Sequence, residues 1–415
     1  MKQIAVIGAG AAGCFAAANL PRSEKYAVTI YEKTGKALQK VRVSGGGRCN
    51  VTHQLFDINA LVEKYPRGAR WLKKTLFRFG PQQTIDWFAA RGVALKTEED
   101  GRMFPTTNSS ETIATAIWER ALENGTEVKF HHRLESLEKK DEKWMLDFGE
   151  KGKTEADAVL ITTGGSPQAL GYEILRKLGH TIEAPVPSLF TFNMPKNPIT
   201  ALMGVAVEDA RVKISGTKLT ESGPLLITHW GMSGPAVLRT SAWGARELAG
   251  KAYQFGALVQ WIPEADDETL KAQFAHFRKS LGKQPVWAKN PFGLPKRLWQ
   301  HFMDTCGIEE GTQWGNLPAP QQRKLTEKLL RDVYPVSGKT TFKEEFVTCG
   351  GVSTKEVSPE TMESRLHQNL YFAGEVLDVD GVTGGFNFQH AWASGWIAAE
   401  ALRKSLDRFA IGLTS

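Results

Sequence analysis

The sequence predicts an α/β fold with a nucleotide-binding domain that both ends of the chain build together. Two observations support this prediction. The segment from Ile4 to Glu32 reads as strand, glycine turn, helix and strand, and the last hundred residues return to strand and helix patterns. Between these segments, from about residue 186 to 340, prolines and glycines indicate short strands, followed by a helical pattern. We therefore expect one doubly wound domain that is interrupted by an insertion.

The first element is a nucleotide fingerprint. An apolar run at residues 4–7 is too short for a helix and is typical of a strand buried on both faces. Gly8 permits a tight turn, Gly10 lets the backbone approach a pyrophosphate, and Gly13 lets helix and strand pack closely. Glu32 follows the second strand, where a carboxylate can accept from ribose hydroxyls. A glycine turn without a ligand would leave Glu32 unexplained, so we predict a dinucleotide site.

A second glycine-rich segment runs from Lys40 to Asn50. Its centre, from Ser44 to Arg48, holds three consecutive glycines, whose N–H groups can converge on an anion or a planar ring. Arg42 and Arg48 flank these glycines. They favour a ligand site over the alternative, a flexible surface loop.

Residues 64–78 carry the densest positive charge in the chain, with six basic residues and no acid. On a helix, four of the six fall on one side by three- and four-residue spacing. A solvated face is the ordinary interpretation, and a contact surface for a phosphate backbone is the alternative. The six residues are Lys64, Arg67, Arg70, Lys73, Lys74 and Arg78, and the four on one side are Arg67, Arg70, Lys74 and Arg78.

Two later strands also end in glycine turns. The run at residues 157–165 is a buried strand that ends at Thr163-Gly164-Gly165, and the run at 369–375 stops at Gly374-Glu375. In a doubly wound sheet, these carboxyl ends of strands are the ligand side. A glycine turn at 378–387 then precedes a helix over 389–405, whose small residues allow close packing on a sheet.

The length of 415 residues suggests two or three domains. We expect a first nucleotide-binding part over residues 1–185, an inserted β subdomain over 186–265, an inserted helical subdomain over 266–333 and a return to the nucleotide-binding domain over 334–415. The net charge of +7 and the pI of about 9.1 permit an anionic partner without requiring one.

The four cysteines lack CxxC or metal-ligand spacing, which argues against a disulfide scaffold, a zinc site and a dithiol reductase. The adjacent His131 and His132 would point to opposite faces of a strand, so they do not form a metal site. No apolar run approaches the ~18 residues of a membrane span. The apolar N-terminus reads as a first βα unit rather than a signal peptide. We therefore predict a cytoplasmic protein without a bound metal.

Together these motifs resemble the BaiN/YhiN-type (HI0933-like) family of bacterial flavoproteins, over essentially the whole chain. The resemblance rests on GAGAAG at 8–13, SGGGRCN at 44–50, GRMFP at 101–105, TTGG at 162–165, THWGMSGP at 228–235, TCGGV at 348–352, GEVLD at 374–378 and GGFNFQ at 384–389. It implies a Rossmann-like FAD-binding domain, interrupted by a β-barrel-like subdomain and a small helical bundle. The free N–H groups at residues 386–388 would suit the flavin edge that becomes anionic on reduction.

The resemblance also implies a set of FAD-binding residues. The pyrophosphate would lie on the first glycine turn, the adenosine on Glu32 and on the backbone of Leu134, and the isoalloxazine ring against Asn387 and Phe388. The full expected set is Gly8, Gly10, Ala12, Gly13, Glu32, Arg42, Ser44, Gly45, Gly46, Arg48, Leu134, Thr163, Gly164, Gly374, Glu375, Gly385, Asn387 and Phe388.

The activity implied by the family is two-electron flavin chemistry. Our first hypothesis is reduction of an electron-poor C=C bond, in particular uridine to dihydrouridine in large-subunit ribosomal RNA. Cys49 and His229 are the candidate proton donors, and the alternatives are a packed thiol and a structural histidine. The chain holds no second GxGxxG with a trailing acid, so NAD(P)H would dock transiently as reductant. The alternatives are an FAD enzyme on a free small molecule, as enone reductase or amine oxidase, and a non-catalytic FAD-bound RNA-binding factor.

Overall fold

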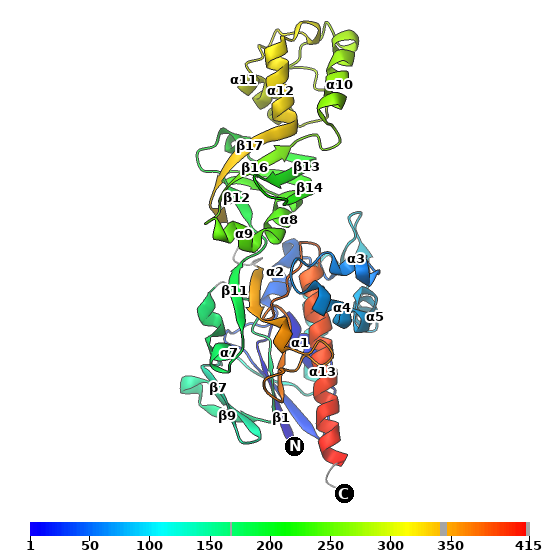
Figure 1. Ribbon diagram of the computed structural model, residues 1–415. Coiled ribbons are helices and arrows are strands. Elements are labelled where there is room, and N and C mark those ends of the chain that lie inside the picture. The colour runs from blue at the N-terminus through cyan, green and yellow to red at the C-terminus, as the bar shows by residue number, and fades with distance from the viewer. Residues whose placement is uncertain (167, 341–346, 412–415) are drawn as a thin grey trace. The chain divides into compact units, whose positions relative to one another are not determined.

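The computed structural model describes residues 1–166, 168–340 and 347–411, and it divides into two compact units (Figure 1). Unit 1 joins Met1–Ser188 to Phe342–Ser415, and unit 2 is the intervening Leu189–Thr341. The two ends of the chain thus build one unit and the middle builds the other.

The core of unit 1 is a five-stranded parallel sheet in the order β20-β10-β1-β2-β6. Its strands are β1 (Lys2–Ile7), β2 (Tyr26–Tyr31), β6 (Glu127–Lys129), β10 (Ala158–Ile161) and β20 (Leu370–Phe372). The chain extends from β1 to β2 and β6 on one side, and later adds β10 and β20 on the other. The strand order therefore reverses between β1 and β10, the position where doubly wound sheets bind ligands. The predicted α/β class is confirmed.

Helices α1 (Ala11–Ala18) and α13 (Phe386–Ile411) pack on this sheet, and α6 (Ser110–Glu123) packs against α1. The contact between α1 and α13 depends on small residues: a Cβ at Gly395 would lie 2.7 Å from the carbonyl oxygen of Ala12. Unit 1 further contains α2 (Gln39–Gly47), α3 (Ile58–Val62), α4 (Ala69–Arg78), α5 (Pro81–Ala89), α7 (Glu173–Lys177), β3 (Thr52–His53), β4 (Leu95–Thr97), β5 (Arg102–Pro105), β7 (Ser136–Lys140), β8 (Lys143–Asp147), β9 (Lys153–Ala156), β11 (Ile182–Pro187) and β19 (Thr348–Val352).

Unit 2 is built on a seven-stranded antiparallel sheet in the order β17-β16-β13-β14-β15-β12-β18. The strands are β12 (Thr191–Asn193), β13 (Ala206–Ile214), β14 (Thr220–Thr228), β15 (Gly231–Ser233), β16 (Gln254–Gln260), β17 (Asp332–Ser337) and β18 (Lys339–Thr340). The helices are α8 (Pro235–Trp243), α9 (Ala245–Gly250), α10 (Asp267–Ser280), α11 (Lys296–Cys306) and α12 (Ala319–Arg331).

One hydrophobic core joins the sheet of unit 2 to its helices. Trp261 at the end of β16, Trp299 on α11 and Trp314 are each at most 1% exposed, and the rings of Trp299 and Trp314 stack with centroids 6.4 Å apart. Because β17 and β18 still pair within this sheet, unit 2 continues beyond its last helix to residue 341.

Within the described residues, no helix is both long and apolar enough to cross a membrane, and no group of three or more His, Cys, Asp or Glu is placed to hold a metal ion. All four cysteines are free and buried.

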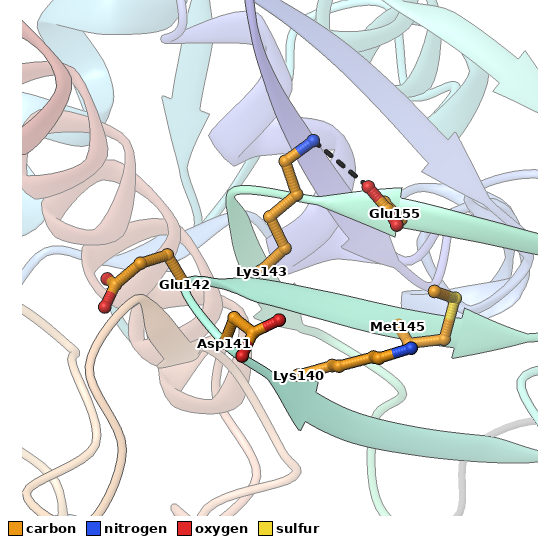
Figure 2. A pocket seen from close by; sticks show the side chains of 6 residues that line it. All are labelled: Lys140, Asp141, Glu142, Lys143, Met145 and Glu155. Atoms are coloured by element: carbon orange, nitrogen blue, oxygen red, sulfur yellow. Dashed lines mark hydrogen bonds and ion pairs between the residues drawn. The ribbon is translucent and has the colours of Figure 1, made fainter.

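A surface hollow lies at the first turn of the β7-β8-β9 sheet (Figure 2). Lys143 and Glu155 form an ion pair of 3.1 Å beside it. The hollow is lined by Lys140, Asp141, Glu142, Lys143, Met145 and Glu155. None of these residues belongs to a glycine-rich segment or to the expected FAD-binding set, so the hollow is lined by no predicted site residue.

Candidate FAD-binding site

The carboxyl ends of four parallel strands carry predicted site residues. Gly8 follows β1, Glu32 follows β2, the turn 162–165 follows β10 and Gly374-Glu375 comes shortly after β20. Because parallel strands end on the same edge of a sheet, the fold brings these residues together although they are up to 367 positions apart in the chain (375 − 8).

The first glycine turn divides into positions that pack and one that is open. Gly8 has φ +112°, and a Cβ there would lie 2.6 Å from the carbonyl oxygen of Thr162. A Cβ at Gly13 would lie 2.1 Å from the carbonyl oxygen of Gly8, so neither position accepts a side chain. At Gly10, the residue before α1, a Cβ would meet no atom of the described chain within 4 Å. This open backbone lies at the N-terminus of α1, where N–H groups and the helix dipole favour an anion.

Glu32 supports this turn from the end of β2. Its Oε2 accepts from the N–H of Ala9 at 2.9 Å, and its Oε1 accepts from the N–H and the hydroxyl of Thr34 at 2.8 and 2.9 Å. A carboxylate offers about four acceptor positions, so capacity for ribose hydroxyls is left. The segment that contains the half-buried Leu134 crosses the same strand end, because the N–H of His132 donates to the backbone carbonyl of Glu32.

The second glycine segment forms a left-handed turn at the end of α2. Gly45, Gly46 and Gly47 have φ of +58°, +67° and +81°, values that favour glycine. At Gly46 and Gly47 a Cβ would meet nothing of the described chain within 4 Å, whereas Gly45 faces Asn50 and Phe104. Two further open backbone positions therefore lie in the α2 segment, which reaches the sheet edge at its start, where the N–H of Leu38 donates to the carbonyl of Ala9.

The two arginines that flank this turn already have protein partners. Arg42 donates to both carboxylate oxygens of Glu111 at 2.8 and 2.9 Å, which raises the pKa of Arg42 and lowers that of Glu111. Arg48 donates to Glu98 at 2.6 Å and lies 4.1 Å from the ring centroid of Phe104. In this structure both arginines hold the turn in place, a role that the charge pattern alone did not indicate.

Glu375 links three segments at the same edge. One carboxylate oxygen pairs with Lys40 Nζ at 2.8 Å, and the other accepts from the N–H of Thr348 at 2.8 Å. A Cβ at Gly165 would lie 2.4 Å from Thr348 Oγ1. That hydroxyl is buried and has no hydrogen-bond partner among the described residues, so it is a polar group available to a ligand.

The N-terminus of α13 is held by its own side chains. Asn387 accepts from the N–H of Gly381 at 2.8 Å and donates to the carbonyl of Gly381 at 2.9 Å. Phe388 stacks on Trp392, with planes 10° apart. Gly385 has φ +90°, and a Cβ there would lie 2.6 Å from the carbonyl oxygen of Thr52.

The expectation that Arg67 belongs to a surface basic face is wrong. Helix α4 begins only at Ala69, so Arg67 precedes it. The Arg67 side chain is 10% exposed and pairs with Asp380, whose side chain is fully buried. Ser188 donates to the same carboxylate and accepts from Arg67. A buried carboxylate without such a partner is costly, which fixes Arg67 in the interior.

The two candidate proton donors occupy different environments. Cys49 is fully buried beside the left-handed turn, with φ +60°, and burial raises the pKa of its thiol to about 12. His229 is exposed in the turn between β14 and β15 of unit 2, where its ring lies edge-on to Trp230 with centroids 4.3 Å apart.

Residues 2–401 match the family model described as the HI0933-like protein Rossmann domain. The chain belongs to this family. It is 29% identical over 97% of its length to the 3-dehydro-bile acid delta(4,6)-reductase of Clostridium scindens, covering 99% of that protein. It is 31% and 28% identical, over 96% of its length, to the ribosomal RNA dihydrouridine synthases of Escherichia coli and Haemophilus influenzae, covering 97% and 98% of them.

Membership of the HI0933-like family confirms the resemblance that the sequence motifs indicated, from which the FAD-binding residues were predicted. The names of these relatives agree with the expected reduction of an electron-poor C=C bond. The structure adds supporting residues outside the expected FAD-binding set, among them Thr162, whose hydroxyl donates to the carbonyls of Ile7 and Gly8 at 3.0 and 2.9 Å. Asp380 is another, and the only sequence signal for it was an acid inside a glycine turn.

Proposed function

We propose that this protein is an FAD-dependent oxidoreductase that reduces an electron-poor C=C bond. The observation that supports it is the gathering of open backbone at one edge of the unit 1 sheet. Gly10, Gly46, Gly47 and Gly164 have space where a Cβ would stand, and each lies in a segment next to the strand ends. A dinucleotide with an attached ring system requires such uninterrupted backbone contact.

The residues present fit FAD. In the proposed assignment, the turn around Gly8, Gly10, Ala12 and Gly13 holds the pyrophosphate, Glu32 the ribose, and the backbone at Leu134 the adenine. The flavin half lies among the remaining expected residues, namely Arg42, Ser44, Gly45, Gly46, Arg48, Thr163, Gly164, Gly374, Glu375, Gly385, Asn387 and Phe388. Bound FAD would supply a hydride from N5 to the substrate carbon.

Around bound FAD, side chains of the protein would hold the binding backbone in position. Asn387 holds the loop before α13 through Gly381, so the first N–H groups of that helix keep one direction. Arg42 and Arg48, through Glu111 and Glu98, fix the left-handed turn. We assign the proton transfer to Cys49 or His229. The thiol of Cys49, with a pKa of about 12, carries its proton at neutral pH.

The proposed substrate is uridine in large-subunit ribosomal RNA, with NAD(P)H as transient reductant and the cytoplasm as the location. Two relatives named ribosomal RNA dihydrouridine synthase and the net charge of +7 support it. In this proposal Arg70, Lys74 and Arg78 on α4 contact RNA phosphates. The base must leave its stack to reach a flavin.

A second candidate is reduction of a free enone. The similarity to the bile acid reductase, at 29% identity over nearly all of both chains, favours it. In that case the basic face of α4 is solvated surface.

The test is an anaerobic titration of the purified protein. We expect a yellow protein whose flavin band bleaches with NADH or NADPH and recovers with ribosomal RNA from a strain that lacks the gene. Recovery with a steroid-type enone and not with RNA would favour the second candidate. A colourless protein that takes up no FAD on reconstitution would overturn both. Cys49→Ala and His229→Gln, assayed in the reoxidation step, decide which residue donates the proton.

A further inference from the structure

The exposed face of α4 combines an aromatic ring with cations. Arg70, Lys73, Lys74 and Phe77 follow the spacing i, i+3, i+4 and i+7, which places them on one side of the helix. Lys73 is half-buried at the margin of this face, and the other three residues are exposed. The opposite side, with Leu72, Thr75 and Leu76, is buried in the core of unit 1. Helix α4 packs against α3 and α13 (Figure 1), and Arg70, Lys74 and Phe77 are exposed to solvent.

Among the described residues, Phe77 has the most exposed aromatic ring of the hydrophobic side chains, at 62%. By contrast, Phe79, two residues later, is buried and stacks on Trp396. A single exposed apolar residue is common on protein surfaces and indicates nothing alone. Its position among three cations on one helix face is what requires an explanation.

The cations of this face are able to contact an anionic ligand. Within the described part of the chain, Arg70 and Lys73 make no ion pair. Lys74 pairs with Glu360 at 2.8 Å, but both side chains are more than half exposed, so this pair contributes little and can exchange for a phosphate. Arg78 is less free, since it donates to the carbonyl of Glu360.

We infer that this face of α4 is a platform for an unpaired RNA base: Phe77 stacks on the base, and Arg70, Lys73 and Lys74 contact the flanking phosphates. Proteins that hold single strands combine a cationic track with aromatic rings, because every base offers a π face to a ring. The inference deepens the proposed function and rests on RNA being the substrate. It gives the enzyme a way to hold a neighbouring base while the reacting uracil is out of its stack.

The test is fluorescence anisotropy of a labelled single-stranded RNA oligonucleotide with the full-length protein at several salt concentrations. Phe77→Leu, which keeps an apolar side chain, should weaken binding about 10-fold while leaving the salt slope unchanged. Phe77→Trp should bind as tightly as the wild type. Lys73→Gln should lower the slope of log affinity against log salt by about 0.7, the value for one phosphate on a single strand. Leu122→Ala, at an exposed apolar position on α6, is the control and should change neither quantity.

If Phe77→Leu binds RNA as tightly as the wild type, or if Leu122→Ala weakens binding equally, the platform is refuted. The outcome is separable from that of the proposed function, because flavin content and bleaching by NAD(P)H are measured on the same variants. A flavin-loaded, reducible protein with unaltered RNA binding in Phe77→Leu would refute only the platform. A flavin-free protein whose RNA binding depends on Phe77 would refute only the enzyme.

Discussion

Replacement of Arg67 by methionine should strongly destabilise unit 1. Methionine retains an unbranched apolar stem but leaves the carboxylate of Asp380 buried without its cation. Asp380 is 0% exposed and Arg67 10% exposed, and their contact comprises two hydrogen bonds, with Ser188 as a third participant. Breaking a buried pair by removing one partner costs about 3–5 kcal/mol. For a unit of this size, that lowers the Tm by about 10 °C.

The matched control lies on the adjacent helix. Lys74→Met also breaks an ion pair, 2.8 Å long, but one in which both partners are more than half exposed. Surface pairs contribute about 0–1 kcal/mol, so the Tm should fall by at most a few degrees. Calorimetry measures both variants, and urea unfolding checks that only the unit 1 transition moves.

The pH dependence gives a second readout. Burial raises the pKa of Asp380, and Arg67 and Ser188 lower it by a smaller amount, so the net shift of this pKa is upward. Without Arg67 this pKa rises further, so the carboxyl protonates when the pH is lowered and the penalty of Arg67→Met should shrink. The double variant Arg67→Met with Asp380→Asn should recover most of the loss at neutral pH. If Arg67→Met costs less than about 1 kcal/mol, or if its cost does not depend on pH, the buried-pair account is refuted.

Two further predictions concern the site. Gly10→Ala should leave the Tm of the flavin-free protein unchanged, since its Cβ meets nothing within 4 Å, but should weaken FAD binding by about tenfold or more, measured by flavin fluorescence quenching. Gly250→Ala, at an equally open glycine of unit 2, is its control, and equal FAD affinity in the two variants would contradict the pyrophosphate assignment. His390 is buried, which lowers its pKa to about 4, so only the unfolded chain binds its proton between pH 6.5 and 4. The contribution of neutral His390 to the free energy of unfolding is complete above pH 6.5 and falls by roughly 3 kcal/mol towards pH 4. In His390→Gln this fall should disappear from the pH dependence of the urea midpoint. If the fall persists in that variant, the account is refuted.

Much of the site was predictable because it is built from backbone. Gly8, Gly10 and Gly13 have distinct steric roles that depend on local turn geometry, and the structure gives each position the packing or the open space expected of it. The same holds for the left-handed turn at Gly45–Gly47, which few residues other than glycine can adopt.

Charged side chains were less predictable, because their partners come from distant segments. The six basic residues of 64–78 look alike in the sequence, yet Arg67 pairs with an acid 313 positions away and is buried, while Arg70 remains exposed. Likewise Arg42 and Arg48 find Glu111 and Glu98 in other elements, which no local spacing indicates.

The sequence by itself determined the α/β class, the glycine turns and the family, because period, turn chemistry and motif order are local properties. Only the tertiary structure decided which of these segments meet at one sheet edge and which charges are neutralised there. The physical reason is that burial and pairing arise from parallel strand order and from contacts such as Arg67–Asp380 and Lys40–Glu375, which join residues hundreds of positions apart.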